Sequence, residues 1–285
     1  MTETGRLTRV AVKHARDAFI DTATANAQWK ALHFTAPPDV GRACAESDAF
    51  IAILESCGAT VERLPPADGT TLDSIYTRDA SIVSPRGVIL CTMGKAARRG
   101  EPAAQEEAFR RLGIPVAGRI TPPGSLEGGD LLWLDATTVV VGRGYRTNAE
   151  GIRQLRVLLG DGVEVVEVPL PHWRGETDVM HLMSLISPVR NDLAVVYPPL
   201  LPVPFREWLI HRGLSFVDVP DAEFETTGTN VLALGPETSV MLRGNPVTRA
   251  RLEAAGVEVI EYAGSEISVK GAGGPTCLTR PLERR

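Results

Sequence analysis

One cysteine near the end of the chain stands in a setting that favours chemistry. Cys277 closes the segment Gly273–Cys277, whose two glycines would let the backbone approach a ligand closely. A thiol can act as a nucleophile when a histidine elsewhere in the chain serves as acid or base, and His181 is the histidine with the most suitable context. Taken alone, each has a plainer interpretation: Cys277 as a small buried hydrophobic residue and His181 as an ordinary core or surface histidine.

Several carboxylates stand at or just before apolar runs that are typical of buried strands. Burial of a carboxylate costs free energy unless it is paired or hydrogen-bonded, so a group of them at equivalent positions indicates a site that binds a cation. The alternative is that some of them satisfy backbone N–H groups at turns or strand edges. The residues in question are Asp73, Asp79, Glu127 and Asp130, with the amide Asn230 in a similar place.

The elements that would hold these residues repeat along the chain. An amphipathic segment, a glycine turn and a short apolar run recur, with the glycines about fifty residues apart. Each copy predicts a helix that ends at a C-cap glycine and leads into a buried strand. The copies are Cys57–Val61, Leu112–Val116, Gly162–Val166, Arg212–Phe216 and Ala255–Val259.

Upstream of these helices, two apolar runs flank a turn and predict hairpins, for example in 81–90 and 131–141. The predicted unit is strand, strand, helix, strand, repeated about five times. One helix cannot cover both faces of its strands, so we expect an α/β fold whose units gather about a common axis with the helices outside. An open α/β sheet with loops of similar length is the alternative. No linker-like segment separates the units, so residues 1–285 are predicted to form one domain.

Composition and charge exclude several classes of function. The chain has 285 residues, of which 44% are hydrophobic and 23% charged, and its formal net charge is -5. This balance suits neither nucleic acid nor an anionic membrane surface, and no apolar run is long enough to span a bilayer. The N-terminal residues lack the apolar core of a secretory signal, and the four cysteines lack the spacing of a disulfide framework or a zinc site. We therefore expect a cytoplasmic protein.

Several of these segments, in chain order, resemble the guanidine-modifying (amidinotransferase) superfamily. Within it the chain is most similar to dimethylarginine dimethylaminohydrolase, with arginine deiminase as the nearest relative. The most specific part is Glu-Gly-Gly-Asp at 127–130 together with Gly-Gly-x-x-Cys at 273–277. Membership implies a five-bladed, pseudo-fivefold α/β propeller of ββαβ units, which agrees with the repeat. The segments that carry the resemblance are Asp73–Asp79, 97–101, Leu126–Asp130, Arg146–Asn148, Met180–Leu182 and Gly273–Leu278.

The resemblance also implies the role of individual residues. Cys277 would be the nucleophile that forms a covalent thiouronium intermediate, His181 the general acid and base, and Glu127 a holder of the guanidinium nitrogens. The products would be citrulline, or an analogue, and an amine or ammonia, and no metal or other cofactor is expected. The substrate-binding positions implied in the same way are Asp79 at the guanidinium, Asp73, Arg98 and Arg146 at the amino-acid portion, and Asp130 in support.

Two residues depart from the family patterns and point to different substrates. Met183 replaces the aspartate of the His-x-Asp found in arginine deiminases and amidinotransferases, which favours a methylated or otherwise substituted arginine. Arg78 precedes Asp79 as in the deiminases, where the dimethylarginine hydrolases tend to have an acidic residue. Arginine deiminase and amidinotransferase therefore stay as alternatives, and a non-catalytic propeller that binds a partner is a remote one. The expected partner is a small guanidine compound, and a homodimer is one option for the assembly.

Overall fold

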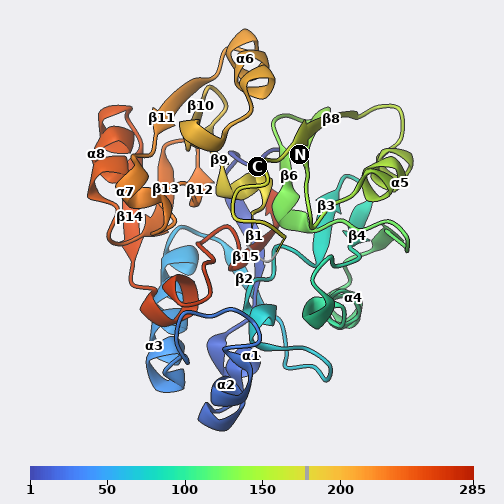
Figure 1. Ribbon diagram of the computed structural model, residues 1–285, viewed down its shortest axis with the longest axis vertical. Helices are drawn as coiled ribbons and strands as arrows, with labels where there is room; N and C mark the ends of the chain where they lie inside the picture. The colour runs from blue at the N-terminus through green and yellow to red at the C-terminus, as the bar shows by residue number, and fades with distance from the viewer. Residues whose placement is uncertain (177–179) are drawn as a thin grey trace.

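The computed structural model describes residues 1–176 and 180–285, which form a mixed α/β fold (Figure 1). Their strands make five separate three-stranded sheets. In each sheet one strand is antiparallel to the middle strand, and the other is parallel to it and follows it in the chain after a helix. The sheets therefore have the strand, strand, helix, strand order that the repeat predicts.

Four of the sheets follow one another along the chain, each with the helix that connects its second and third strands. They are β3 (Ser81–Ser84), β4 (Gly87–Leu90), α4 (Glu101–Arg111) and β5 (Val116–Arg119); β6 (Leu131–Trp133), β7 (Thr138–Arg143), α5 (Ala149–Leu159) and β8 (Glu164–Pro169); β9 (Ile186–Arg190), β10 (Leu193–Val196), α6 (Val203–His211) and β11 (Ser215–Asp218); and β12 (Val231–Gly235), β13 (Thr238–Leu242), α8 (Pro246–Ala254) and β14 (Glu258–Tyr262).

The fifth sheet brings together segments from the two ends of the sequence. β15 (Thr279–Arg284) is antiparallel to β1 (Leu7–Val12), and β2 (Thr60–Arg63) is parallel to β1 and follows it after α3 (Val40–Ser56). The first strand of this unit is thus supplied by the last strand in the chain, a pairing that the local sequence pattern did not predict.

Glycines end the connecting helices because the residue after a helix commonly adopts a positive φ that a side chain disfavours. Four of the five predicted glycines have this conformation: Gly58, Gly113, Gly213 and Gly256, with φ of 88°, 70°, 83° and 83°. The prediction is wrong for Gly162. Helix α5 ends at Leu159 and its C-cap is Gly160, with φ of 78°, so the turn comes two residues earlier in a segment that offers two glycines.

Apolar clusters fill the space between the sheets. Successive strand residues point to opposite faces, so Val139 and Val141 of β7 pack toward the β3–β5 sheet while Val140 packs toward the β9–β11 sheet. Similar clusters join the β9–β11 sheet to β12–β14, the β12–β14 sheet to β1 and β2, and the β1 sheet to β3–β5. Each sheet therefore shares an apolar cluster with two others.

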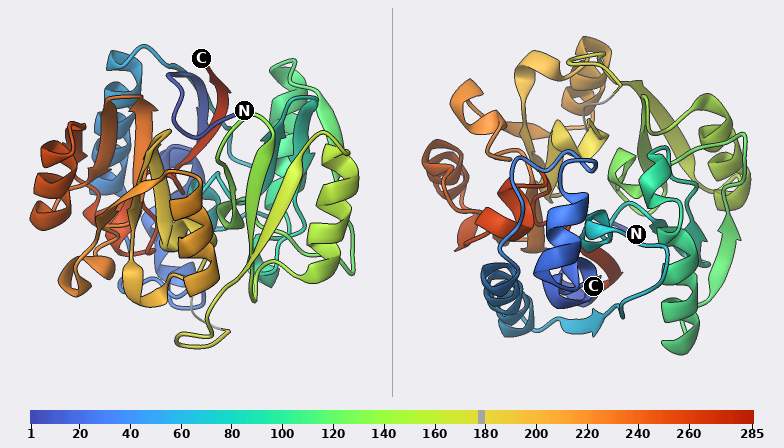
Figure 2. Two further views of the ribbon diagram at one scale, coloured as in Figure 1. Left: turned by 90° about the horizontal axis from the view of Figure 1, so that it is seen from above. Right: turned by 60° about the horizontal axis from the view of Figure 1, so that its bottom comes forward.

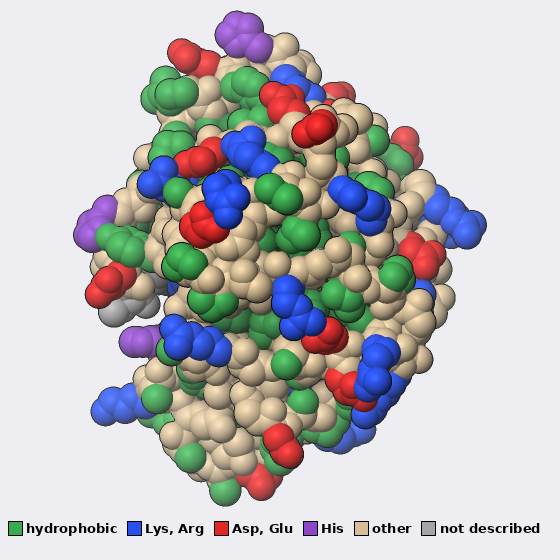
Figure 3. Space-filling model, turned by 90° about the vertical axis from the view of Figure 1, so that its right-hand side faces the viewer, with side chains coloured by type: hydrophobic (Ala, Val, Ile, Leu, Met, Phe, Trp, Pro, Cys, Tyr) green, Lys and Arg blue, Asp and Glu red, His purple; other side chains and the backbone are tan. Residues whose placement is uncertain are grey.

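The long helices lie at the periphery of the strands (Figure 1). The face that carries α4 and α5 shows basic and acidic side chains interspersed (Figure 3). On α5, Arg153 Nε pairs with Glu150 Oε2 at 2.7 Å. No helix among the described residues has the length and apolar character needed to cross a membrane. The remaining short elements are α1 (Ala15–Phe19), α2 (Thr22–Gln28), α7 (Asp221–Phe224), the 3-10 turns η1 (Leu72–Ile75), η2 (Ala96–Arg98), η3 (Gly128–Asp130), η4 (Leu182–Ser184) and η5 (Pro198–Leu200), and the π turn η6 (Ser265–Val269).

Candidate active site

The predicted site residues stand at equivalent points of the five sheets. Each sheet has one strand that is antiparallel to its middle strand, and a polar or nucleophilic residue precedes that strand by a few positions. This is the placement that the sequence predicts. The pairs of residue and following strand are Cys277 and β15, Asp79 and β3, Glu127 and β6, His181 and β9, and Asn230 and β12.

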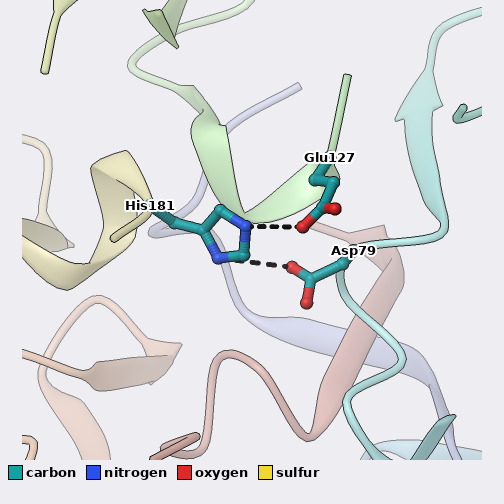
Figure 4. Close-up of side chains that lie close together, drawn as sticks. All are labelled: Asp79, Glu127 and His181. Carbon is teal, nitrogen blue, oxygen red and sulfur yellow. Dashed lines mark hydrogen bonds and ion pairs between the residues drawn. The ribbon is translucent and has the colours of Figure 1, made fainter. Parts of the chain in front are cut away.

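Three of these side chains form a buried cluster (Figure 4). His181 Nε2 lies 2.8 Å from Glu127 Oε2, and His181 Nδ1 lies 3.8 Å from Asp79 Oδ1. A Cβ at Gly129 would lie 2.6 Å from both Asp79 Oδ1 and His181 Nδ1. The second glycine of the Glu-Gly-Gly-Asp motif is therefore required by the close approach of the histidine and the carboxylate.

The cluster holds a proton on His181 at neutral pH. Burial alone would lower the pKa of His181, but the charges of Asp79 and Asp130 and the hydrogen bond to Glu127 raise it to about 9. Burial alone would raise the pKa of Glu127, but the hydrogen bond and charge of His181 and the charge of Arg146 hold it well below its usual range. The pair is therefore an imidazolium and a carboxylate.

Asn230 fixes the segment that carries the thiol. Its Nδ2 donates to Cys277 Sγ over 3.3 Å, and its Oδ1 accepts from the backbone N and the hydroxyl of Thr276, at 2.9 and 2.8 Å. Burial and the charge of Asp79 raise the pKa of Cys277, while the hydrogen bond from Asn230 opposes that shift. The thiol is therefore the resting form at neutral pH, and sequence reasoning, which listed Asn230 without a role, missed this contact.

Asp130 ties the Glu127 turn to the His181 turn. Its Oδ1 accepts from Leu182 N at 2.9 Å and its Oδ2 from the Thr147 hydroxyl at 2.6 Å. Thr147 Oγ1 in turn accepts from Glu127 N at 3.2 Å. Burial raises the pKa of Asp130 to about 6, with the two hydrogen bonds opposing the shift.

Arg98 is buried and its donors are used within the protein. Nη1 donates to Asp79 Oδ2 at 2.5 Å, and Nε and Nη2 donate to the Glu101 carboxylate at 2.9 and 2.8 Å. Nη2 also donates to the Tyr76 carbonyl at 2.9 Å. Arg98 therefore holds Asp79 in this structure, and its expected contact with the amino-acid portion of a substrate stays a prediction.

The other two residues expected at that portion are also paired with protein groups. Asp73 accepts from Lys95 Nζ at 2.6 Å, and Arg146 Nη1 lies 3.1 Å from Glu127 Oε2. Lys95 reaches the site twice, because its backbone N also donates to Glu127 Oε1 at 3.1 Å. Lys95 is not among the predicted site residues, because a lone lysine near Arg98 offers no sequence signal that separates it from a surface lysine.

Cys277 and His181 line a common cavity of about 110 Å³. Trp173 and Phe224 form part of its wall, with ring centroids 6.2 Å apart in an edge-to-face arrangement. Arg174 and Glu225, which also line it, make an ion pair at 2.5 Å. The cavity thus brings a thiol, an imidazolium and an aromatic wall together.

The two residues that pointed to different substrates differ in where they lie. Arg78 is buried and its Nη2 donates to Glu3 Oε2 at 3.1 Å, so its side chain is directed away from the cluster at Asp79. Met183 is buried in η4, two residues after His181, and supplies no carboxylate there. The feature shared with the deiminases therefore has no direct part in the site geometry.

Comparisons with known proteins agree with the motifs. A family model described as N,N dimethylarginine dimethylhydrolase, eukaryotic, matches residues 18–284. The N(G),N(G)-dimethylarginine dimethylaminohydrolase of Streptomyces coelicolor is 34% identical over 242 residues, which are 85% of this chain and 86% of that protein. The arginine deiminase of Rhodococcus erythropolis is 30% identical over 250 residues, which are 74% of this chain and 60% of that protein.

The fold is similar to that of solved structures. A cysteine-to-serine mutant of the dimethylarginine dimethylaminohydrolase of Pseudomonas aeruginosa, complexed with citrulline, has a TM-score of 0.77 and 23% identity, and the match covers 96% of this chain and 98% of that one. At this identity the likeness speaks for the fold alone. The family match and the Streptomyces relative confirm the resemblance seen in the motifs: this chain belongs to the dimethylarginine dimethylaminohydrolase family of the guanidine-modifying superfamily.

Proposed function

We propose that this protein hydrolyses a guanidine C–N bond of an N-substituted arginine and releases citrulline, or an analogue, and an amine. As a member of its family it is an amidine-hydrolysing enzyme that acts on a small guanidine compound. The observation that carries the proposal is the buried cluster of Asp79, Glu127 and His181, whose histidine shares a cavity with Cys277. The names of its relatives support the substrate class.

Asp79 is the carboxylate best prepared to hold a guanidinium. Its Oδ2 accepts from Arg98, whereas its Oδ1 is buried and has no hydrogen-bond partner among residues 1–176 and 180–285. His181 Nδ1 lies 3.8 Å from this oxygen, beyond hydrogen-bond distance, so Oδ1 can still accept from a cationic donor, which a guanidinium supplies in a planar fork. Glu127 already accepts from His181, Arg146 and the Lys95 backbone, so in this arrangement its main part is to orient His181.

Substrate binding would activate the nucleophile. The guanidinium neutralises the charge of Asp79, which otherwise raises the pKa of Cys277, and the thiol then loses its proton to solvent. The thiolate attacks the guanidine carbon and forms a C–S bond. Protonated His181 donates its proton to the departing nitrogen, which leaves with the electrons of the C–N bond as a neutral amine.

The covalent intermediate is an S-alkylthiouronium cation on Cys277. Neutral His181 then takes a proton from water, whose oxygen adds to the same carbon. Collapse breaks the C–S bond, the hydroxyl proton passes to the sulfur, and the urea group of citrulline forms. His181 returns to the protonated form that its carboxylate neighbours favour.

The geometry favours a substituted arginine over arginine. Met183 supplies no carboxylate that could grip a second unsubstituted nitrogen, and Arg78, which resembles the deiminases, pairs with Glu3 instead. Arginine deiminase and amidinotransferase stay as alternative functions, distinguished by the substrate and by the acceptor. Asp73 and Arg146 stay candidates for contact with the amino-acid portion of the substrate. To make that contact, each would exchange one protein partner for the substrate.

A panel assay tests the substrate. Citrulline formation is measured with arginine, monomethylarginine, dimethylarginine, agmatine and N-hydroxyarginine, using Cys277→Ser as the control. We expect kcat/KM to be highest for a methylated arginine. A higher value for arginine would make the protein a deiminase, and acceleration by a second amine with transfer of the amidino group would make it an amidinotransferase. If no compound reacts or protects Cys277 from alkylation, the guanidine assignment is wrong.

We also propose that the five sheets close into a five-bladed propeller that forms a single domain. The five apolar clusters support this, because each sheet shares a cluster with two others and the series returns from β12–β14 to β1. Antiparallel pairing of β15 with β1 would lock the ring. A crystal structure with an open gap between two of these sheets would contradict the closure. The predicted cytoplasmic location and homodimer stay predictions.

A further inference from the structure

A second cavity, of about 320 Å³, lies away from the thiol. Its lining includes residues near both chain ends, whereas Trp173 and Arg174 line the cavity at Cys277. The left view of Figure 2 shows both termini at one end of the molecule and the loop near residue 174 at the opposite end. The two cavities share no lining residue.

Positive charge gathers around this second cavity. Four arginines line it, and Glu3 and Glu283 are its acidic side chains. Glu3 pairs with Arg78 at 3.1 Å, and Glu283 lies 3.4 Å from Arg9, which is not part of the lining. The lining side chains thus carry an excess of positive charge. The four arginines are Arg78, Arg280, Arg284 and Arg285.

Three of these arginines have donors without partners. Arg280 uses Nη2 on the Arg78 carbonyl, and Arg284 uses Nη1 on the Gly5 and Ala233 carbonyls. The Nε atoms of Arg78, Arg280 and Arg284, and Nη2 of Arg284, are buried and have no hydrogen-bond partner in the described part of the chain. Buried N–H groups on a cation are costly to leave unpaired, so the cluster lacks an acceptor.

The cationic state of two of these groups is destabilised as well. Burial and the charge of Arg78 lower the pKa of Arg280 to about 9, and burial lowers the pKa of Arg284 to about 10. A bound anion would offset both effects by supplying opposite charge at short range. The shifts agree with the unpaired donors and with the excess of positive charge.

We propose that this cavity binds a small anion that carries at least two negative charges, of the phosphate or polycarboxylate class. Guanidinium groups match both chemistries, because their parallel N–H bonds fit two oxygens of one phosphate or carboxylate. The site is linked to the catalytic centre through the backbone: Arg280 donates to the Arg78 carbonyl, and Arg78 N donates to the Cys277 carbonyl over 3.1 Å.

Isothermal titration with inorganic phosphate and with citrate, at constant ionic strength set with chloride, tests the proposal. We expect one of the two to bind with a stoichiometry of one. Arg284→Gln should weaken that binding at least about tenfold, roughly 1.4 kcal/mol. The control Arg153→Gln, which removes the same charge on the surface of α5, should leave it unchanged. Stronger binding of citrate or of phosphate identifies the ligand chemistry.

Trp133, which lines the cavity, reports where the probe binds. Binding should change tryptophan fluorescence in the native protein, and the change should vanish in Trp133→Phe while the heat of binding persists. The proposal is overturned if neither probe binds above the chloride background, if Arg284→Gln binds as tightly as the native protein, or if the fluorescence change survives in Trp133→Phe.

Discussion

Removing the side-chain amide of Asn230 should raise the pKa of the Cys277 thiol and slow every reaction that needs the thiolate. Asn230 Nδ2 donates to the sulfur over 3.3 Å, and this hydrogen bond lowers the pKa of the thiol. A hydrogen bond to a charged group is worth about 1.5 to 3 kcal/mol. At about 1.36 kcal/mol per pKa unit, Asn230→Ala should raise the pKa of Cys277 by about 1 to 2 units.

The rate of alkylation by iodoacetamide measures the thiolate directly. Below the pKa this rate is proportional to the thiolate fraction, so at pH 7 it should fall about ten- to a hundredfold in Asn230→Ala, as the pKa shift requires. The difference should shrink at high pH, where both proteins carry thiolate. Because only the protonation equilibrium has changed, the two pH profiles should have the same shape and differ by a displacement along the pH axis.

Thr276→Val is the matched control. It removes the hydroxyl that donates to Asn230 Oδ1 but keeps the backbone N–H bond at 2.9 Å and leaves Asn230 able to donate to the sulfur. The Thr276 hydroxyl also lies 3.9 Å from Cys277 Sγ and lowers the pKa of the thiol less than Asn230 does, so we expect a smaller displacement of the alkylation profile in Thr276→Val than in Asn230→Ala. An Asn230→Ala profile that coincides with the native one would refute the reasoning, and so would an equal displacement in both variants.

Three further predictions concern the cluster around His181. Because the pKa of His181 is raised from 6.5 to about 9, kcat should fall above about pH 9 as the general acid loses its proton. The stability that the charge of His181 contributes should be complete below pH 6.5 and lost as the pH rises through about 9. Urea unfolding at several pH values measures this loss. A kcat that stays constant from roughly pH 7 to pH 10.5 would contradict this, because that range extends about 1.5 to 2 units to each side of the expected pKa. Gly129→Ala should lower kcat at least about a hundredfold while the circular dichroism spectrum persists, because its Cβ would lie 2.6 Å from Asp79 Oδ1 and His181 Nδ1. Gly162→Ala, whose Cβ meets nothing within 4 Å, is the control. Equal activity of the two variants would contradict the close approach of His181 and Asp79 at Gly129. Treatment with EDTA should leave turnover unchanged, because His181 Nε2 and Glu127 Oε2 share a hydrogen bond of 2.8 Å, and a metal ion would need both atoms as ligands. A loss of activity that zinc restores would show that the cluster binds a metal.

The sequence predicted the repeat because hydrophobic periodicity and C-cap glycines are local signals. It also predicted that Asp79, Glu127, His181, Asn230 and Cys277 precede strands of different units, and the structure has them there. The pairing of β15 with β1 joins residues at opposite ends of the chain, and no local pattern specifies such a partner. The error at Gly162 has a similar cause, because Gly160 and Gly162 are equally able to adopt a positive φ and only the length of α5 decides between them.

Ion-pair partners were the part of the site that the sequence could not supply. Arg98 has Asp79 on one side and Glu101 on the other, and charge alone does not distinguish these carboxylates from that of a substrate. The partner of Arg78 could not be predicted either, because its pairing with Glu3 depends on packing that brings the N-terminal segment beside it. The resemblance to the family therefore assigned candidate positions along the chain, while the direction of each arginine needed the fold.

The central claim is that Cys277 forms a covalent bond with the guanidine carbon. Mass spectrometry of the enzyme quenched during turnover, followed by peptide mapping, tests it most directly. His181→Ala, given a substrate analogue whose leaving group is a thiol and departs without an acid, should trap the thiouronium because it lacks the base that activates water. We expect an adduct of the substrate's amidino-alkyl mass on the peptide that contains Cys277, and no turnover in Cys277→Ser. An enzyme that carries no adduct on Cys277 under these conditions, and that keeps full activity as Cys277→Ser, would contradict the account.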